Sequence, residues 1–151
     1  MDYDKFFSRN SEEVAVDLLG RMLLRNTKIG STSGRIIETG VYVGGKETKS
    51  REGMKYTPGK IFLMPYRGSS LLNISTDREG FASCVEIRGI AFHSGVINGA
   101  GKVARFFDIT EDLDSIMLGE ELQIIGDAVD KSEVRKAKGD SSNCVGFCYI
   151  K

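Results

Sequence analysis

The sequence predicts an α+β fold, with one domain over residues 1–151, a curved mixed or antiparallel β-sheet and a few peripheral helices. Two observations indicate a sheet: apolar residues fall in short runs of strand length, and turns that contain glycine separate these runs. Helical spacing occurs in only a few places. At 151 residues, with 40% hydrophobic residues, the chain can bury a core of its own.

The first predicted element is a helix. Asn10 and Glu13 resemble a capping box, and the apolar residues that follow have helical spacing, which predicts a helix over 11–19. Gly20 is placed to end it. The segments that follow are a short buried strand (22–25), a polar turn region (26–34), a second strand (35–43) and a surface loop (44–59).

A β-hairpin is predicted next. Its strands, 60–64 and 71–75, meet across 65–68, a tip that carries an aromatic ring and a cation. The strand that follows, 82–90, has Cys84, Glu86 and Arg88 on one face and Val85 and Ile87 on the other. The remaining elements are a short helix (98–107), one helical turn within 108–120, and strands over 121–125 and 144–150.

Charge excludes a generally basic nucleic-acid binder, because the formal net charge is zero. Two segments, 46–67 and 131–138, are nevertheless rich in Lys and Arg, while 108–130 holds eight acids and no base. The molecule is polarised if the two basic segments share a face, and otherwise it has a mixed, solvated surface. The sequence leaves both possibilities open.

Export and membrane insertion are not indicated, so a cytoplasmic protein is expected. Cys84, Cys144 and Cys148 suit reduced, buried thiols, and no spacing around them or His93 predicts a metal site. The segment 99–102 resembles a phosphate loop without its full spacing, which excludes nucleotide hydrolysis. We expect no cofactor.

A pocket is predicted from two strands. Alternation along the strand 35–43 puts Glu38 and Tyr42 on one side of a cleft, and Asn73 is expected on a facing strand. A carboxylate, an aromatic ring and an amide together can hold a flat heteroaromatic group and activate a water beside it. Hydrolysis of a nucleoside bond requires both.

The order of motifs resembles the alkyladenine (3-methyladenine) DNA glycosylase family of base-excision repair enzymes, of which this chain would be a short, divergent member. The matching segments are A-V-D-L-L-G-R-M-L (15–23), R-I-I-E-T-G-V-Y-V-G (35–44), P-G (58–59), Y-R-G-S-S-L-L-N (66–73), C-V-E-I-R (84–88) and G-A-G-K-V (99–103). The resemblance implies a monomeric hydrolase that flips an alkylated purine out of double-stranded DNA and cleaves its N-glycosidic bond.

The resemblance also implies roles for single residues. Tyr42 would stack on the flipped base, Asn73 would line the base pocket, and Arg88 would hold the DNA backbone and the attacking water. Tyr66 would fill the gap left in the duplex. Arg67 at the hairpin tip and Lys102 at the helix start would contact DNA as cations.

One departure from the family is that Gly40 stands where the family has its catalytic glutamate. Glu38, two residues earlier on the same strand face, is the substitute that the sequence offers, and the runner-up function is an inactive binder of damaged DNA. A more remote alternative is an RNA- or nucleotide-binding module. Glu38 also fits an ion pair with Arg35 or Arg88, Tyr42 a half-buried core ring, and Asn73 the cap of a β-bulge.

Overall fold

The computed structural model describes residues 1–44, 56–141 and 144–149. Its helices are α1 (Tyr3–Phe7), α2 (Ser11–Leu18) and α3 (Ala100–Phe106), with short 3-10 turns η2 (Glu111–Leu113) and η3 (Lys131–Glu133). Its strands are β1 (Met22–Thr27), β2 (Gly30–Tyr42), β3 (Ile61–Tyr66), β4 (Ser69–Ser75), β5 (Cys84–Phe92), β6 (Gly95–Asn98), β7 (Leu122–Ile125), β8 (Arg135–Ser141) and β9 (Cys144–Cys148).

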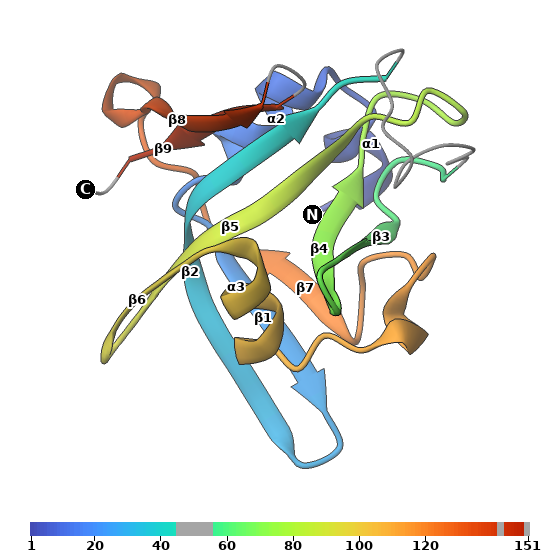
Figure 1. Cartoon of the computed structure of the whole chain (residues 1–151), viewed down its shortest axis with the longest axis vertical. Coiled ribbons are helices and arrows are strands. Elements are labelled where there is room, and N and C mark those ends of the chain that lie inside the picture. The colour runs from blue at the N-terminus through green and yellow to red at the C-terminus, as the bar shows by residue number, and fades with distance from the viewer. Residues whose placement is uncertain (45–55, 142–143, 150–151) are drawn as a thin grey trace.

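The described strands form one antiparallel sheet with β5 and β2 at its centre. The order is β3-β4-β5-β2-β1-β7, and β6 pairs with β5, β9 with β2, and β8 with β9. Figure 1 shows β2 and β5 running side by side through the molecule, with the other strands curling away from them. The predicted α+β fold with a curved sheet is confirmed, and its pairing is antiparallel.

The main core lies on one side of β5 and β2. Alternation puts Val85 and Ile87 in this core, where α2 contributes Val14 and Leu18, all of them fully buried. The side chains of β5 that alternate with them face a second, smaller apolar cluster, which holds Cys84. Because one face of these strands is committed to the main core, the other face is available to form a site.

The predicted N-terminal helix is confirmed. Asn10 is its N-cap, and the side chain of Asn10 accepts a hydrogen bond from the backbone N–H of Glu12 at 2.8 Å. Gly20 follows with φ +94, a conformation that glycine adopts without strain, and its N–H donates to the carbonyl of Ile36. The helix therefore ends where its sequence signal places the end.

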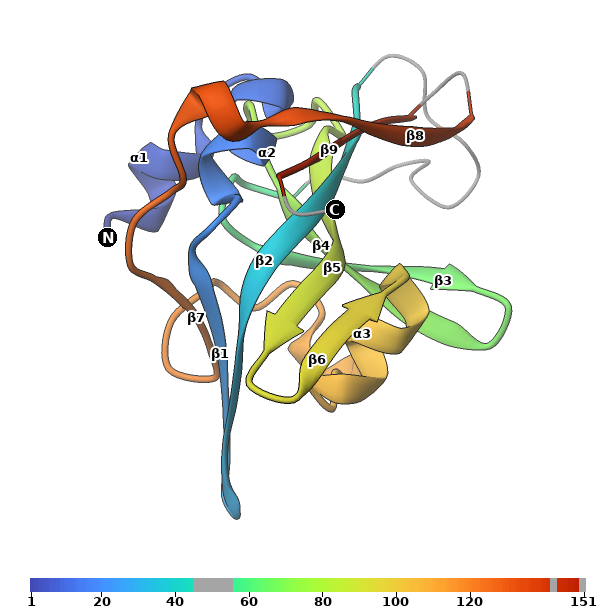
Figure 2. The same ribbon diagram turned by 90° about the vertical axis from the view of Figure 1, so that its left-hand side faces the viewer.

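The predicted polar turn over 26–34 is wrong. These residues extend β1 and β2 into a long hairpin whose tip is Lys28–Ile29, and Figure 2 shows it projecting from the body of the molecule. Polar side chains support the ladder: Thr27 Oγ1 donates to the carbonyl of Gly30, and Ser31 Oγ donates to Asn26 Oδ1. A hairpin exposed on both faces needs no apolar alternation, so the usual strand signal is missing.

Other elements had no clear signal in the sequence. α1, β6 and β8 were not predicted, and β8 is rich in charged residues because it lies at the edge of the sheet. The surface loop predicted over 44–59 lies mostly outside the described residues. None of the helices in the described part of the chain has the length and apolar character that a bilayer crossing requires.

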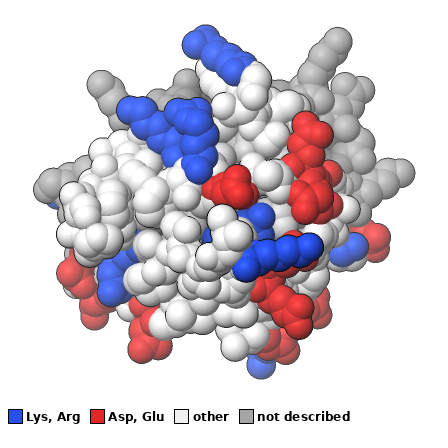
Figure 3. All heavy atoms as spheres, turned by 90° about the horizontal axis from the view of Figure 1, so that it is seen from below, with Lys and Arg blue, Asp and Glu red and all other residues white. Residues whose placement is uncertain are grey.

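The surface is mixed in charge on the face shown in Figure 3, where Lys and Arg side chains lie close to Asp and Glu side chains. Part of the basic segment 46–67 falls outside the described residues. This face carries both positive and negative side chains, and a polarised distribution of charge over the whole molecule stays a prediction.

Candidate active site

A cavity of about 820 Å³ lies between the β3–β4 hairpin, the central strands β2 and β5, and the start of α3. Small-molecule sites in proteins commonly have volumes of about 300–1,000 Å³. The residues that line the cavity are Glu38, Tyr42, Met64, Tyr66, Arg67, Ser69, Leu71, Glu86, Arg88, Gly99, Ala100 and Gly101. The lining therefore combines polar groups with aromatic and aliphatic ones.

The β3–β4 hairpin supplies one wall. Tyr66 pairs with Ser69 across a two-residue turn in which Arg67 has φ +48 and Gly68 has φ +80. Two central residues with positive φ characterise the tight turns that match the twist of paired strands. The tip is thus narrower than the predicted 65–68, and the Tyr66 ring is exposed with the Arg67 guanidinium 5.2 Å from its centroid.

Glu86 and Arg88 form a buried ion pair on the cavity wall. Arg88 Nε donates to Glu86 Oε1 at 2.7 Å, and the two side chains are 6% and 3% exposed. The two residues are separated by one position along β5, so their side chains leave the same face of the strand. An ion pair this deeply buried holds both charged groups in fixed orientations.

Arg88 also binds across the sheet. Its Nη2 donates to the hydroxyl of Tyr42 at 2.9 Å and to Cys144 Sγ at 2.8 Å. Burial lowers the pKa of Arg88, but Glu86, Cys144 and Tyr42 together raise it by more, so the guanidinium stays charged. Burial, reinforced by Glu86, raises the pKa of Tyr42 above its usual range, so its phenol stays protonated.

Gly40 leaves the space that the Arg88 guanidinium occupies. An ideal Cβ on Gly40 would lie 2.5 Å from Cζ and 2.5 Å from Nε of Arg88. The pairing of β2 with β5 is also irregular here: Glu38 pairs with Gly89 and Thr39 with Ile87, which skips Arg88. Such bulges redirect side chains, and they recur beside active sites.

Asn73 lies behind the cavity wall, and it is absent from the cavity lining. It is on β4, which is separated from β2 by β5 in the same sheet, so the facing-strand prediction is wrong. Asn73 pairs with Glu86, and its Nδ2 donates to Glu86 Oε2 over a long 3.4 Å. Asn73 Oδ1 accepts a hydrogen bond from the Cys84 thiol at 3.4 Å. Asn73 therefore contacts Glu86, and the same Nδ2 donates to the carbonyl of Leu71 at 3.3 Å.

Most of the predicted site residues converge on this cavity. Glu38, Tyr42, Tyr66, Arg67 and Arg88 all line it. Two predicted residues do not line it, Asn73 and Lys102. Lys102 is an exposed residue on α3 and follows the lining residue Gly101.

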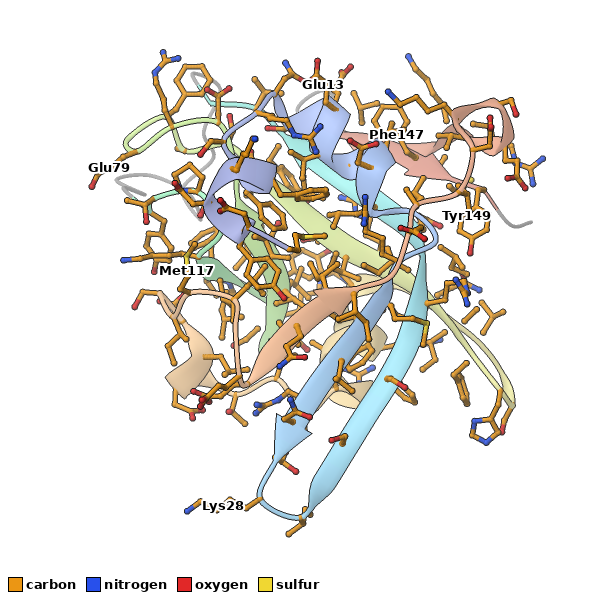
Figure 4. All side chains as sticks on the ribbon, turned by 180° about the vertical axis from the view of Figure 1, so that it is seen from behind. Glu13, Lys28, Glu79, Met117, Phe147 and Tyr149 are labelled. Carbon is orange, nitrogen blue, oxygen red and sulfur yellow. The ribbon has the colours of Figure 1, made fainter. Side chains whose placement is uncertain are left out.

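The β3–β4 hairpin, which carries Tyr66 and Arg67, is distinct from the long β1–β2 hairpin. Figure 4 shows Lys28 at the end of the β1–β2 hairpin, with its side chain pointing away from the body of the molecule. Lys28 does not line the cavity. It is therefore a suitable position for control substitutions.

Sequence reasoning missed two groups at the site. Glu86 was placed on the same face as Arg88 but was given no role, and Cys144 contacts Arg88 across 56 positions of the chain. Strand alternation could have identified Glu86, because a glutamate two positions from a buried arginine lies on the same face of the strand and suits an ion pair. No local signal identifies Cys144, since its contact depends on the pairing of β9 with β2.

The cavity can hold a flat heteroaromatic group against apolar and aromatic walls, with carboxylates and a guanidinium at its polar side. A carboxylate there can accept a proton from water, and the fixed cation can orient that water. This combination suits hydrolytic cleavage of a bond to a planar base.

Comparison with known proteins points the same way. The family model of methylpurine-DNA glycosylase matches residues 5–146. A relative from Sodalis glossinidius, named as a candidate 3-methyladenine DNA glycosylase, is 32% identical over 126 residues, which are 75% of this chain and 72% of the relative. Two relatives with the same name come from Ehrlichia ruminantium, at 32% identity over 74% of this chain and 65% of the relative, and Bacillus subtilis, at 28% over 70% and 66%.

Proposed function

Because the chain belongs to the methylpurine-DNA glycosylase family, we propose that it removes alkylated purines of the 3-methyladenine type from double-stranded DNA. The base would be flipped into the cavity and its N-glycosidic bond hydrolysed, leaving an abasic site. The observation that carries the proposal is the convergence of Glu38, Tyr42, Tyr66 and Arg88 on one cavity. We further propose that it acts as a monomer.

The hairpin tip supports the base-flipping step. Extruding a base costs a few kcal/mol, and the cost is smallest for damaged or mismatched bases. Tyr66 is 54% exposed at the mouth of the cavity, where its ring can stack in the gap that the flipped nucleotide leaves. The adjacent Arg67 places a cation where DNA phosphates would pass.

The chemistry of the lesion supports hydrolysis with modest assistance. A purine in DNA that is methylated at N3 or N7 carries a positive charge, so the base leaves as a neutral molecule. Glu38 and Tyr42 line the same cavity as Arg88, so a water activated by Glu38 and oriented by Arg88 would attack the sugar carbon beside the bound base. Neutral bases need stronger activation, and we expect a narrow range of substrates.

Release from defined duplexes tests the proposal. The full chain is incubated with duplex oligonucleotides that carry an alkylated purine, hypoxanthine or no lesion, and alkali-labile abasic sites are measured over time. We expect release from the alkylated duplex alone. Glu38→Gln is compared with Glu13→Gln, the same chemical change at an exposed position on α2 outside the cavity. Absence of release from every duplex contradicts the proposal.

An inactive binder of damaged DNA is the second candidate, and Gly40 favours it. The position lacks a carboxylate, and Arg88 fills the space where one would start. Such a protein would bind the alkylated duplex more tightly than the undamaged one and release no base. Binding measured by fluorescence anisotropy beside the release assay distinguishes the two functions.

A further inference from the structure

A carboxylate faces Gly40 from the neighbouring strand. Glu86 on β5 pairs directly with Gly40 on β2. Side chains at directly opposite positions leave the same face of a sheet, with Cβ atoms about 4.5–5.5 Å apart. Glu38, by contrast, lies two positions along β2 from Gly40, about 6.6–6.8 Å for regular strand geometry, in a stretch whose pairing is irregular. Glu86 is thus the nearer carboxylate to the space in front of Gly40.

The Arg88 guanidinium requires this arrangement. A side chain at position 40 would start 2.5 Å from Cζ of Arg88, so the guanidinium would have to leave its present place if residue 40 were an acid. With glycine at position 40, Arg88 lies against β2 and takes its carboxylate partner from its own strand, at 2.7 Å. The cavity therefore still has an acid beside the arginine, but the acid is on β5 and not at position 40 of β2.

Stability alone is a poor explanation for this pair. Burying two charges costs desolvation, and well-packed apolar residues of similar volume are often as stable or more stable. Glu86 and Arg88 are both almost fully buried, and both still reach the cavity wall. A buried, charged pair that lines a cavity is better explained by what it does there.

We propose that Glu86, more than Glu38, is the catalytic carboxylate of the glycosylase reaction, an inference that rests on the proposed function. The water oxygen forms a bond to C1′ of the deoxyribose, and the bond from C1′ to the base nitrogen breaks. Its electron pair passes to the cationic base, which leaves neutral, and the water proton passes to Glu86. Arg88 fixes the carboxylate through Nε, and Asn73 supports it from behind.

Moving the carboxylate back to the other strand tests the proposal. The full chain and its variants Glu86→Gln, Glu38→Gln, Glu13→Gln and the double variant Gly40→Glu with Glu86→Gln act on duplex DNA methylated with dimethyl sulfate. Released methylpurines are measured by chromatography under single-turnover conditions with protein in excess, so that differences in affinity are removed. Circular dichroism melting of each variant shows whether it is folded.

We expect Glu86→Gln to slow the release of methylpurine by about 10²-fold or more, the usual contribution of a general base. Glu38→Gln should slow release by less. The unaltered chain should lose activity toward acid pH as its carboxylate is protonated, and Glu86→Gln should lose that acidic limb. The double variant should recover part of the rate, because the glutamine releases Arg88 from its charged partner.

The outcomes separate this inference from the function on which it rests. No release of methylpurine by the unaltered chain overturns both. Release by the unaltered chain, with Glu86→Gln equally fast or Glu38→Gln slower than it, overturns the assignment of Glu86 alone, as does a folded double variant no faster than Glu86→Gln. If Glu86→Gln does not fold, Glu86→Asp replaces it: a slower rate with the acidic limb kept supports the assignment, and an unchanged rate overturns it.

Discussion

Replacing Gly40 with alanine tests the packing of the site directly. The new methyl group would lie 2.5 Å from Cζ and Nε of Arg88, far inside contact distance, so the guanidinium must move. We expect this movement to break the 2.7 Å bond from Arg88 to Glu86, and a hydrogen bond to a charged group contributes about 1.5–3 kcal/mol. Alanine in a strand favours folding by about 0.5–1 kcal/mol over glycine. The net loss should be about 0.5–2.5 kcal/mol.

Urea unfolding followed by circular dichroism measures this loss. Gly119→Ala is the matched control, because the nearest atom to its added methyl group would be 3.8 Å away and its backbone needs no positive φ. We expect the control to change the free energy of unfolding by less than about 0.5 kcal/mol. Gly40→Ala with the stability of the unaltered chain contradicts the packing argument.

The same substitution in a chain that lacks Glu86 and Arg88 tests whether the guanidinium causes the loss of stability. Replacing Glu86 with leucine and Arg88 with methionine removes both charges and keeps similar volume, which is often nearly neutral for stability. In that background the methyl group of alanine at position 40 meets no guanidinium, so the substitution should cost nothing. An equal cost in both backgrounds would show that the strain lies elsewhere than at Arg88.

Three further outcomes follow from particular contacts. Tyr66→Ala should weaken binding or flipping in lesion-containing duplex, while Lys28→Ala at the distant hairpin tip should leave anisotropy and flipping unchanged. Burial and the hydrogen bond to Asp114 raise the pKa of Tyr56 to about 12 from its ordinary 10. The stability that the protonated Tyr56 contributes is therefore complete below pH 10 and is lost as the pH rises towards 12. Tyr56→Phe should flatten that decline in urea titrations. Asn10→Ala removes the cap on Glu12 and should lower the free energy of unfolding by about 1 kcal/mol.

The sequence predicts those parts of the fold whose signals are local. The helix cap at Asn10, the turn at Gly20 and the alternation along β5 are each set by neighbouring residues, and all three are found in the structure. The β1–β2 hairpin was missed, because polar residues on both faces of a projecting ribbon give no alternation. Charged β8 was missed because an edge strand can be polar.

The candidate site shows the same division. Alternation along β2 correctly brought Glu38 and Tyr42 to one cavity, but it measures distance only along one strand. Which residue of β5 lies opposite Gly40 depends on the register between strands that are more than forty positions apart in sequence, and a bulge at Arg88 shifts that register. Glu86 therefore emerged as the nearer acid only when the pairing was known.

Gly40 and Glu86 are best understood as one feature of the sheet. Opposite positions share the space between two strands, so a side chain gained at one is accommodated by what is absent at the other. Here glycine on β2 gives the Arg88 guanidinium room to lie flat against that strand, and glutamate on β5 neutralises the guanidinium. Each residue alone would be unfavourable: Glu86 would be a buried charge without Arg88, and a side chain at position 40 would displace the Arg88 guanidinium from its present place. The absence of an acid at position 40 is thus tied to the presence of one at position 86, and it does not by itself indicate a site that has lost its chemistry.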